Sequence, residues 1–571
     1  MDLKEKVAAK LAEELKLKSA AEFAQILEVP PDEKLGDYAL PCFPFAKELK
    51  KAPPLIAKEL VGKIKKDGLV EEVKVVGPYL NLFLNKENII NTTVTAVLEE
   101  KERYGAGASK AERVMIEYSQ PNTHKAFHVG HLRGTSIGEA LARILKHAGY
   151  DVIQANYSGD TGMHVAKWLW CYTRFHKDEC PPKEGKGKWL ASLYVEAVKK
   201  LEKEPELQEQ VDTINRELEE GKEKALLDLW TQTRQWSIDE FDAIYDDLQA
   251  HFDKWWFERE MEAKGKAIAQ ELVKKGIARV SDGATIVDLE QYNLGVWVLL
   301  RKDGTVLYSA KDLALAEIKF NEHNIGRSIY VVGKAQALHM QQLFKTLELM
   351  EFKQAARCFH LSYEEVRLPD GKMSSRTGQN ILYQEIKDEV FSYAEQEVRK
   401  RHEEWDEKEI AAVTKAVGVC ALKFEMVYRD HNKPIVFETE RVCDFEGDTG
   451  PYLQYTHARC NSILAKLAEQ GKTVKKRSSF AAIASEHEFR LAKRLLDFPL
   501  VIEKVAATLY PEELAKYVLE LAKTFNSFYH ECKVLGEPAD VENARALLVH
   551  ATAVVLERSL FLLGIDAPKR M

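Results

Sequence analysis

The alternation of short strands, loops and helices that begins near Arg113 is the feature that most constrains the fold. VMIEYS at 114–119 is a short apolar strand, and DVIQANY at 151–157 is the next one. Between them, HLRGTSIGEALARILKHAG carries apolar residues at helical spacing and ends at Gly149, a residue typical of a helix stop. Strand–helix–strand units with short loops predict a parallel, doubly wound sheet, whose ligands bind at the carboxyl ends of the strands.

Changes of pattern divide the rest of the chain. Residues 1–105 read as a separate α+β unit, and residues 106–375 carry the α/β pattern, interrupted by a helical insertion at about 170–290. Residues 376–448 are predicted to form a helical junction and residues 449–571 a second helical domain.

Charge and cysteine usage exclude several classes of protein. Lys and Arg total 82 against 90 Asp and Glu, a net charge of −8, so a nucleic-acid surface must be a local patch. The eight cysteines contain no C-x-x-C pair, and neither a metal site nor a disulfide framework is expected. No signal peptide or long apolar run is found, so we expect a cytoplasmic protein with no membrane partner.

Two histidines flank a glycine where the predicted helix begins. In YSQPNTHKAFHVGHLRGTSIG, His128 and His131 lie on either side of Gly130. A helix N-terminus offers free N–H groups to a phosphate, and a glycine allows close approach to the backbone. The imidazoles share one face of the turn and can donate to a phosphoryl group in a transition state. Alone, the motif is short enough to be two surface histidines.

A second loop, RLPDGKMSSRTG at 367–378, is rich in Gly and Ser and offers cations and hydroxyls to a polyphosphate. By itself this segment would be read as a charged surface turn. The two motifs in this order, across one α/β domain, indicate a nucleotide site.

These motifs resemble the two signatures of class I aminoacyl-tRNA synthetases, HIGH at residues 128–131 and KMSKS at residues 372–376. The wider segment EYSQPNTHKAFHVGHLRGTSIG, FEGDTGPYLQYTHAR at 445–459 and the C-terminal LFLLGIDAPKRM are similar to arginyl-tRNA synthetases, and the similarity covers essentially the whole chain. The resemblance implies a Rossmann-like catalytic domain with a helical insertion, a mainly α-helical C-terminal anticodon-binding domain, and a small α+β N-terminal domain that contacts the outer corner of tRNA.

The resemblance also implies an arginine–tRNA ligase. L-arginine and ATP, with Mg²⁺ as part of the substrate complex, form arginyl-adenylate, and the terminal ribose of tRNA(Arg) then takes the arginyl group. Adenylate formation is expected to require tRNA, and we expect a monomer with no tightly bound cofactor. By resemblance, ATP binding and transition-state stabilisation fall to His128, Gly130 and His131. Lys372 is expected to neutralise the pyrophosphate, while Met373 and Ser374 shape its loop.

One position departs from the family pattern. Ser375 stands where KMSKS has its second lysine, so one positive charge is missing. In relatives with this gap a lysine just upstream of the first signature compensates, and Lys125 occupies that position as a catalytic candidate. The alternative is that Lys125 is an ordinary solvated loop lysine.

Recognition of arginine needs acceptors for a planar guanidinium, and carboxylates suit it best. By resemblance, Tyr308 and Asp312 frame that group and Gln336 recognises the side chain. Glu117 and Asn122 match residues that hold the α-amino and carboxylate ends, and His128 is assigned to the arginine site as well. The alternative for Asp312 is purely structural, because Ser309 to Asp312 has the S-x-x-D spacing of a helix capping box.

The segment GPYLQYTHAR supplies the candidate tRNA contacts. Tyr452 and Tyr455 are three residues apart and suit stacking on unpaired anticodon bases, and Arg459 suits a phosphate contact. Half-buried core tyrosines and a solvated arginine are the structural alternatives. For the whole chain, the rival functions are another class I synthetase, an inactive tRNA-binding paralogue and a small-molecule nucleotidyltransferase.

Overall fold

The computed structural model describes residues 3–369, 381–472, 474, 479–483 and 485–571, and its centre is a five-stranded parallel sheet. The strand order is β11-β10-β4-β5-β6, with all neighbours parallel. The strands are β4 (Arg113–Glu117), β5 (Asp151–Ser158), β6 (Lys254–Phe257), β10 (Arg327–Gly333) and β11 (Cys358–Tyr363). The predicted doubly wound sheet is therefore observed.

Sheet topology fixes where a ligand can bind. From β4 the chain adds β5 and β6 on one side and later returns to place β10 on the other, so the strand order reverses between β4 and β10. In open parallel sheets this point leaves a crevice at the carboxyl ends of the strands. Helix α6 (Val129–His147) begins beside the crevice, and the chain turns back after it at Gly149, whose φ is +93°.

Two strand segments behave differently from the sequence prediction. β7 (Ala278–Ser281) and β8 (Ala284–Asp288) lie within the range predicted for the helical insertion, but they form a separate antiparallel sheet with β9 (Val296–Leu300). β6 lies in a stretch predicted as helical; its run of aromatic residues favours an extended edge strand. Helices α11 (Glu258–Lys274), α12 (Tyr308–His323) and α13 (Ala337–Leu349) complete this half of the domain.

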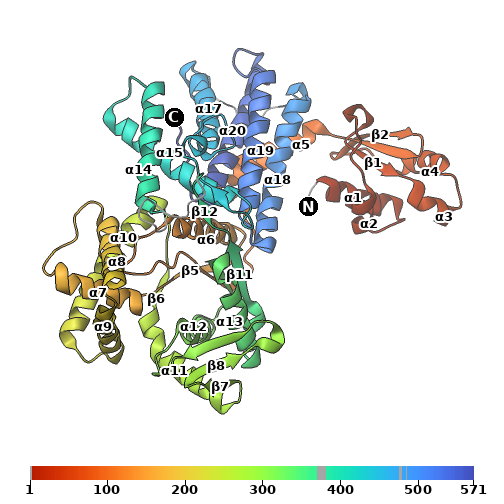
Figure 1. Ribbon diagram of the computed structural model, residues 1–571. Helices are drawn as coiled ribbons and strands as arrows, with labels where there is room; N and C mark the ends of the chain where they lie inside the picture. Colours follow the sequence, from red (N-terminus) through yellow and green to blue (C-terminus); the bar gives the residue numbers. More distant parts are fainter. Residues whose placement is uncertain (1–2, 370–380, 473, 475–478, 484) are drawn as a thin grey trace.

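Four helices project between β5 and β6 (Figure 1): α7 (Met163–Phe175), α8 (Lys186–Lys203), α9 (Gln208–Glu220) and α10 (Lys224–Leu248). Their apolar faces meet in two small clusters, centred on Trp168 and on Trp170. This helical insertion, α7 to α10, reaches the end of the sheet through the ion pair of Arg234 with the buried Asp160, whose N–O distance is 2.9 Å.

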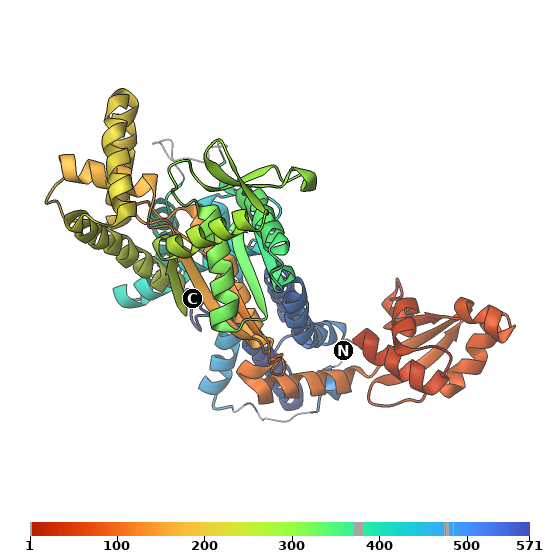
Figure 2. The ribbon, with the colours of Figure 1, turned by 90° about the horizontal axis from the view of Figure 1, so that it is seen from below.

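The N-terminal unit stands away from the rest of the molecule (Figure 2). It contains α1 (Leu3–Leu15), α2 (Ala20–Ile26), α3 (Ala46–Leu49), α4 (Pro53–Leu60) and an antiparallel sheet of β1 (Tyr38–Pro41), β3 (Tyr79–Leu84) and β2 (Val70–Val76). The following helix α5 (Lys86–Glu100) packs against α18 (Glu486–Thr508) and α20 (Ala539–Leu562) of the C-terminal region, so a packed helix connects the N-terminal unit to the rest of the molecule.

Helices form most of the C-terminal region: α14 (Tyr383–Arg401), α15 (Glu407–Tyr428), α16 (Thr439–Val442), α17 (Gly450–Glu469), α18 (Glu486–Thr508), α19 (Glu512–Glu531) and α20 (Ala539–Leu562). The short strands β12 (Val366–Arg367) and β13 (Ile435–Val436) pair where this region joins the sheet domain. None of the described helices combines the length and the apolar character that a membrane span requires.

Candidate active site

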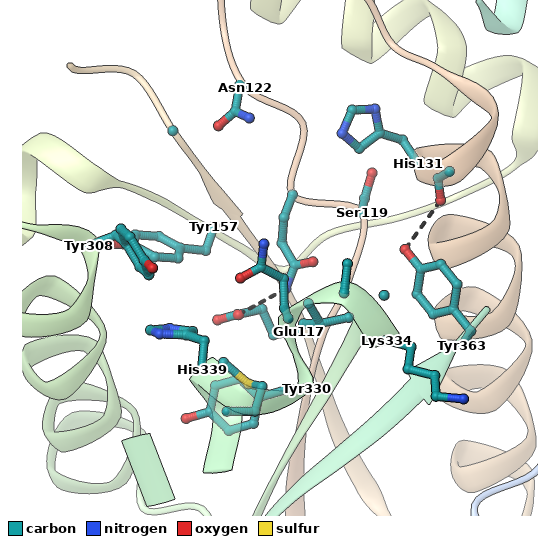
Figure 3. A pocket seen from close by; sticks show the side chains of 18 of the residues that line it. Glu117, Ser119, Asn122, His131, Tyr157, Tyr308, Tyr330, Lys334, His339 and Tyr363 are labelled. Carbon is teal, nitrogen blue, oxygen red and sulfur yellow. Dashed lines mark hydrogen bonds between the residues drawn. The ribbon is translucent and has the colours of Figure 1, made fainter. Parts of the chain in front are cut away.

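A pocket of about 740 Å³ lies at the carboxyl ends of the parallel strands (Figure 3). It brings together predicted residues that are up to 219 positions apart in the sequence, Glu117 and Gln336 among them. All of the predicted ATP-binding and arginine-binding residues before position 370 line it: Glu117, Asn122, His128, Gly130, His131, Tyr308, Asp312 and Gln336. Lys372, Met373 and Ser374 lie outside the described residues.

His128 and His131 form a stacked pair at the start of α6. His128 is the N-cap, and its Nδ1 accepts from the Gly130 N–H at 3.1 Å. The His128 N–H donates in turn to His131 Nδ1 at 3.2 Å, and the two ring centroids are 3.7 Å apart. Because both Nδ1 atoms accept from backbone N–H groups, both neutral rings carry their proton on Nε2. The pair therefore presents two Nε2–H donors.

Both imidazoles are neutral at physiological pH. Burial, with a smaller contribution from the charge of Lys125, lowers the pKa of His128 to about 4. Burial and the neighbouring His128 hold the pKa of His131 well below its usual value. The pair can thus donate hydrogen bonds to a phosphoryl group without carrying a charge itself.

Gly130 leaves room for the ring of His128. A Cβ at this position would lie 2.9 Å from His128 Cε1, closer than such contacts occur. The predicted reason for the glycine was space for a ligand at the backbone, whereas here the His128 ring lies over that backbone.

Helix α10 of the insertion anchors the loop between β4 and α6. The loop backbone is unusual, because Ser119, Gln120 and His124 all have positive φ. Ser119 Oγ lies 2.7 Å from the Tyr245 hydroxyl, and the His124 N–H donates to Ser237 Oγ at 2.9 Å. Both partners come from α10, so the insertion holds the pocket loop in its strained conformation.

Glu117 forms the end of β4 and the floor of the pocket. Its side chain is 5% exposed, and the carboxylate lies 2.5 Å from the Nζ of the fully buried Lys319. Gln120 Nε2 donates to the other carboxylate oxygen at 3.0 Å (Figure 3). The site thus holds a fixed carboxylate beside the histidine pair, with its charge balanced by a buried lysine.

Asp312 belongs to a hydrogen-bonded chain that the sequence analysis did not find. Trp297 Nε1 donates to His339 Nδ1 at 3.2 Å, and His339 Nε2 lies 2.6 Å from Asp312 Oδ2. Because an indole only donates, His339 accepts at Nδ1 and donates from Nε2 to the carboxylate. Tyr308 covers the same imidazole, with ring centroids 4.7 Å apart.

The capping alternative for Asp312 is wrong. Leu307 is the N-cap of α12, no side chain caps this helix, and Ser309 Oγ donates instead to the Val298 carbonyl. The Asp312 side chain is therefore free to line the pocket.

Two more pocket residues were missed. Glu258 follows β6 directly, and burial raises the pKa of its carboxyl. Tyr157 has a buried hydroxyl with no hydrogen-bond partner among the described residues. If β6 had been predicted as a strand, Glu258 at its carboxyl end would have been a candidate. For His339, the available signal was its position three residues after Gln336 in YVVGKAQALH.

Lys125 is close to the histidine pair but does not line the pocket. It is half-buried, and its Nζ lies 5.3 Å from the centre of the Tyr194 ring on α8. Burial, followed by the nearby Lys167, lowers its pKa. Lys125 is therefore not the freely solvated lysine of the alternative interpretation.

A second pocket, of about 1250 Å³, lies between α17, α19, the α14–α15 loop and the C-terminus. Tyr455 and Arg459 line it, and the Arg459 guanidinium lies 4.9 Å from the Tyr455 ring and 5.1 Å from the Tyr529 ring. Tyr452 does not line it; its hydroxyl accepts from Asn526 Nδ2 at 2.7 Å. The structure therefore separates the two predicted tyrosines.

Three family models cover this chain. A model described as the catalytic domain of class I (R) tRNA synthetases matches residues 93–438, the arginyl tRNA synthetase N-terminal domain matches residues 1–84, and the DALR anticodon-binding domain matches residues 453–571. The chain belongs to the arginyl-tRNA synthetase family. Class I synthetases use ATP for aminoacylation.

Similar proteins agree with membership in this family. Curated arginine–tRNA ligases of Clostridium acetobutylicum and Halothermothrix orenii are 37% and 35% identical, and each match covers 100% of both chains. The solved arginyl-tRNA synthetase of Thermus thermophilus is 28% identical, with a TM-score of 0.78 over 99% of each chain. The fold predicted for the family, with catalytic, N-terminal and C-terminal helical parts, is thereby confirmed.

Proposed function

We propose that this protein is an arginine–tRNA ligase that activates L-arginine with ATP and transfers the arginyl group to tRNA(Arg). The observation that carries the proposal is the charge of the pocket at the carboxyl ends of the strands. Five carboxylates and one lysine line it: Glu117, Glu258, Asp312, Glu364, Glu365 and Lys334. Such a pocket suits a cationic side chain, and the neutral histidine pair beside it suits a phosphate.

Arginine binds with its guanidinium toward Asp312 and Tyr308. The His339 proton fixes one oxygen of Asp312, which leaves the carboxylate oriented as an acceptor for the guanidinium. Glu258, Gln336 and the hydroxyl of Tyr157, which has no hydrogen-bond partner in the described part of the chain, complete the acceptors on this side. Glu117 and Asn122 hold the α-amino and carboxylate ends, and His128 lies at the boundary with ATP.

ATP, with Mg²⁺ as its substrate complex, binds over the start of α6. The two Nε2–H groups of His128 and His131 donate to the phosphate as the arginine carboxylate attacks it. Because both donors are fixed before the reaction, little reorganisation is needed when charge develops. Lys372 neutralises the pyrophosphate, Met373 and Ser374 shape that loop, and Lys125 supplies the charge that Ser375 lacks.

The second pocket receives the anticodon loop of tRNA(Arg). Tyr455 stacks on a base, and Arg459, held between two tyrosine rings, meets a phosphate. Tyr452 belongs to the same proposed surface, where its bond to Asn526 supports the position of Arg459, since Arg459 Nη1 donates to the same asparagine at 2.5 Å.

The proposal includes a monomer that acts in the cytoplasm.

Arginine-dependent ATP–pyrophosphate exchange, measured with and without tRNA, tests the proposed activity. We expect exchange with arginine and tRNA together, and charging of tRNA(Arg) in the same preparation. No exchange with any amino acid, despite tRNA binding, would instead identify an inactive tRNA-binding paralogue.

The role of Lys125 is tested in the same assay. Lys125→Ala should abolish exchange, whereas the matched control Lys167→Ala, on the neighbouring α7, should retain it. Full exchange in Lys125→Ala would leave the ligase assignment standing and reject this lysine as the substitute cation.

A further inference from the structure

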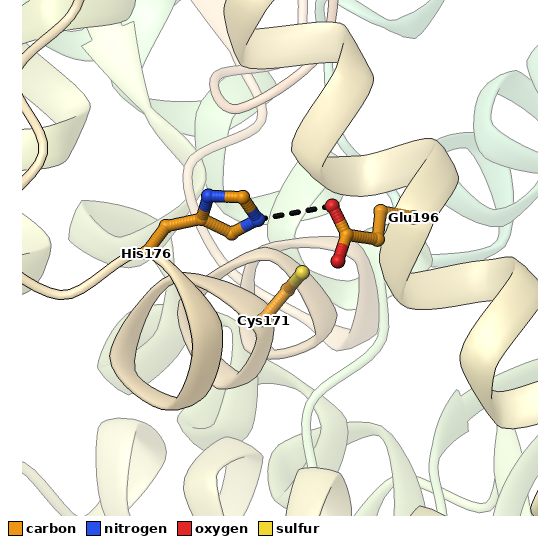
Figure 4. A group of neighbouring side chains, drawn as sticks. All are labelled: Cys171, His176 and Glu196. Atoms are coloured by element: carbon orange, nitrogen blue, oxygen red, sulfur yellow. Dashed lines mark hydrogen bonds and ion pairs between the residues drawn. The ribbon is translucent and has the colours of Figure 1, made fainter.

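A group of three potential metal ligands lies in the helical insertion, outside the two pockets described above (Figure 4). The group, here the Cys171 cluster, consists of Cys171 on α7, His176 directly after that helix, and Glu196 on α8. One ligand atom of each residue lies within 4.8 Å of those of the other two. His176 Nε2 and Glu196 Oε2 are 2.9 Å apart.

The remaining atoms of the same side chains are held by outer partners. His176 Nδ1 lies 3.0 Å from Glu179 Oε1, which fixes the ring and leaves Nε2 facing the cluster. Glu196 Oε1 lies 3.4 Å from the Nζ of Lys200, which leaves Oε2 facing the cluster. Metal-binding histidines commonly give their second ring nitrogen to a carboxylate, and metal-binding carboxylates are commonly bonded on their outer oxygen. The cluster has both of these supports.

The ligand types select the metal. A thiolate, an imidazole and a carboxylate together suit Zn²⁺ and disfavour Mg²⁺ or Ca²⁺, which prefer oxygen ligands. One thiolate and one carboxylate also neutralise the two charges of the ion. Cys171 is buried, while the His176 and Glu196 side chains are 20% and 36% exposed, so an ion can enter from the solvent side.

We propose that Cys171, His176 and Glu196 bind one Zn²⁺ ion, with a water molecule as fourth ligand. Binding releases two protons to solvent, the thiol proton of Cys171 and the Nε2 proton with which His176 faces Glu196, so that Sγ and Nε2 can both bind the ion. The ion joins the end of α7 to α8, whose own apolar clusters are small. No metal site was predicted from the sequence, because the cysteines form no C-x-x-C pair and no tight His/Cys cluster, and Glu196 comes from the next helix.

Cobalt is the spectroscopic probe. The full-length protein, stripped with a chelator, should bind one equivalent of Co²⁺ with a thiolate-to-cobalt absorption band in the near ultraviolet. Cys171→Ser should remove the band, and His176→Asn should weaken binding. Cys180→Ser is the matched control, because this exposed cysteine lies in the same segment outside the cluster, and its spectrum should equal the wild type.

Zinc content and circular dichroism complete the test. Protein purified from zinc-supplemented cells should contain about one zinc per chain, and Cys171→Ser should contain none while keeping the wild-type helical spectrum. A wild type without cobalt band or bound zinc would overturn the proposal and identify the cluster as ion pairs alone. A band that persists in Cys171→Ser, or is lost in Cys180→Ser, would overturn it as well.

Discussion

The hydrogen-bonded chain Trp297–His339–Asp312 gives the sharpest prediction about arginine recognition. His339→Phe keeps a ring of similar shape between Trp297 and Tyr308 but removes the donor 2.6 Å from Asp312. A hydrogen bond to a charged group contributes about 1.5–3 kcal/mol. If the whole of this hydrogen-bond energy orients Asp312 for the guanidinium, KM for arginine should rise roughly 13- to 160-fold.

Trp297→Phe changes the same hydrogen-bonded chain one residue further from Asp312. It leaves His339 in place but removes the N–H that fixes its tautomer, a neutral hydrogen bond of about 0.5–1.5 kcal/mol. The expected rise in KM for arginine is roughly 2- to 13-fold. Because Trp297 acts through His339, the double variant should be no worse than His339→Phe alone.

Pyrophosphate exchange with tRNA present, at varied arginine and varied ATP, measures these effects. KM for ATP should stay within about twofold of the wild type in all three variants, since the histidine pair is untouched. Thermal unfolding controls for the loss of buried bonds. Equal rises in both KM values, or independent and additive effects of the two substitutions, would refute the positioning role of His339.

The remaining predictions concern the histidine pair, the second pocket and pH. Gly130→Ala should displace the His128 ring, because the new Cβ would lie 2.9 Å from it, and should reduce exchange at an unchanged melting temperature. Tyr455→Ala should weaken tRNA binding roughly 5- to 160-fold in a filter-binding assay if a base stacks there, whereas Tyr452→Phe, which removes only the hydroxyl that supports Arg459 through Asn526, should weaken it less. The free energy of unfolding, from urea titrations, should fall as the pH drops from about 6.5 toward 4, because the unfolded chain takes up protons on histidines that stay neutral in the fold. Burial lowers the pKa of His124 to about 3, of His147 to about 4 and of His164 to about 3. Stability that is flat over this range would contradict the last prediction.

Local pattern was enough to predict the strand–loop–helix around His128. Apolar periodicity marks β4, α6 and β5, and the loop residues lie between them, so sequence neighbours are also neighbours in the site. Family resemblance was needed for Tyr308, Asp312 and Gln336, which come from later elements that only the sheet topology brings back to β4.

Other features were outside the reach of local pattern. The four-residue strand β6 is too short for periodicity to distinguish it from the helices on either side, and Glu258 was missed with it. Lys319 reads as an ordinary helix lysine, yet it is fully buried because Glu117 from another element supplies its counter-charge. The burial and the role of such residues depend on partners that are distant in the sequence.

The distribution of charge resolves an apparent conflict between the composition and the proposed substrates. A chain of net charge −8 would repel tRNA if its charges were evenly spread. Instead, the pocket at the strand ends is rich in carboxylates, whereas the second pocket has five basic and two acidic side chains: Arg459, Lys466, Lys533, Lys569 and Arg570 against Glu404 and Glu469. Since fields from exposed charges fade within about 10 Å at moderate salt, each ligand responds to the local charge of its own pocket. A basic patch of the kind predicted for nucleic acid therefore lines the second pocket, on the helical C-terminal region, whereas the pocket at the strand ends has the acidic lining that suits a guanidinium.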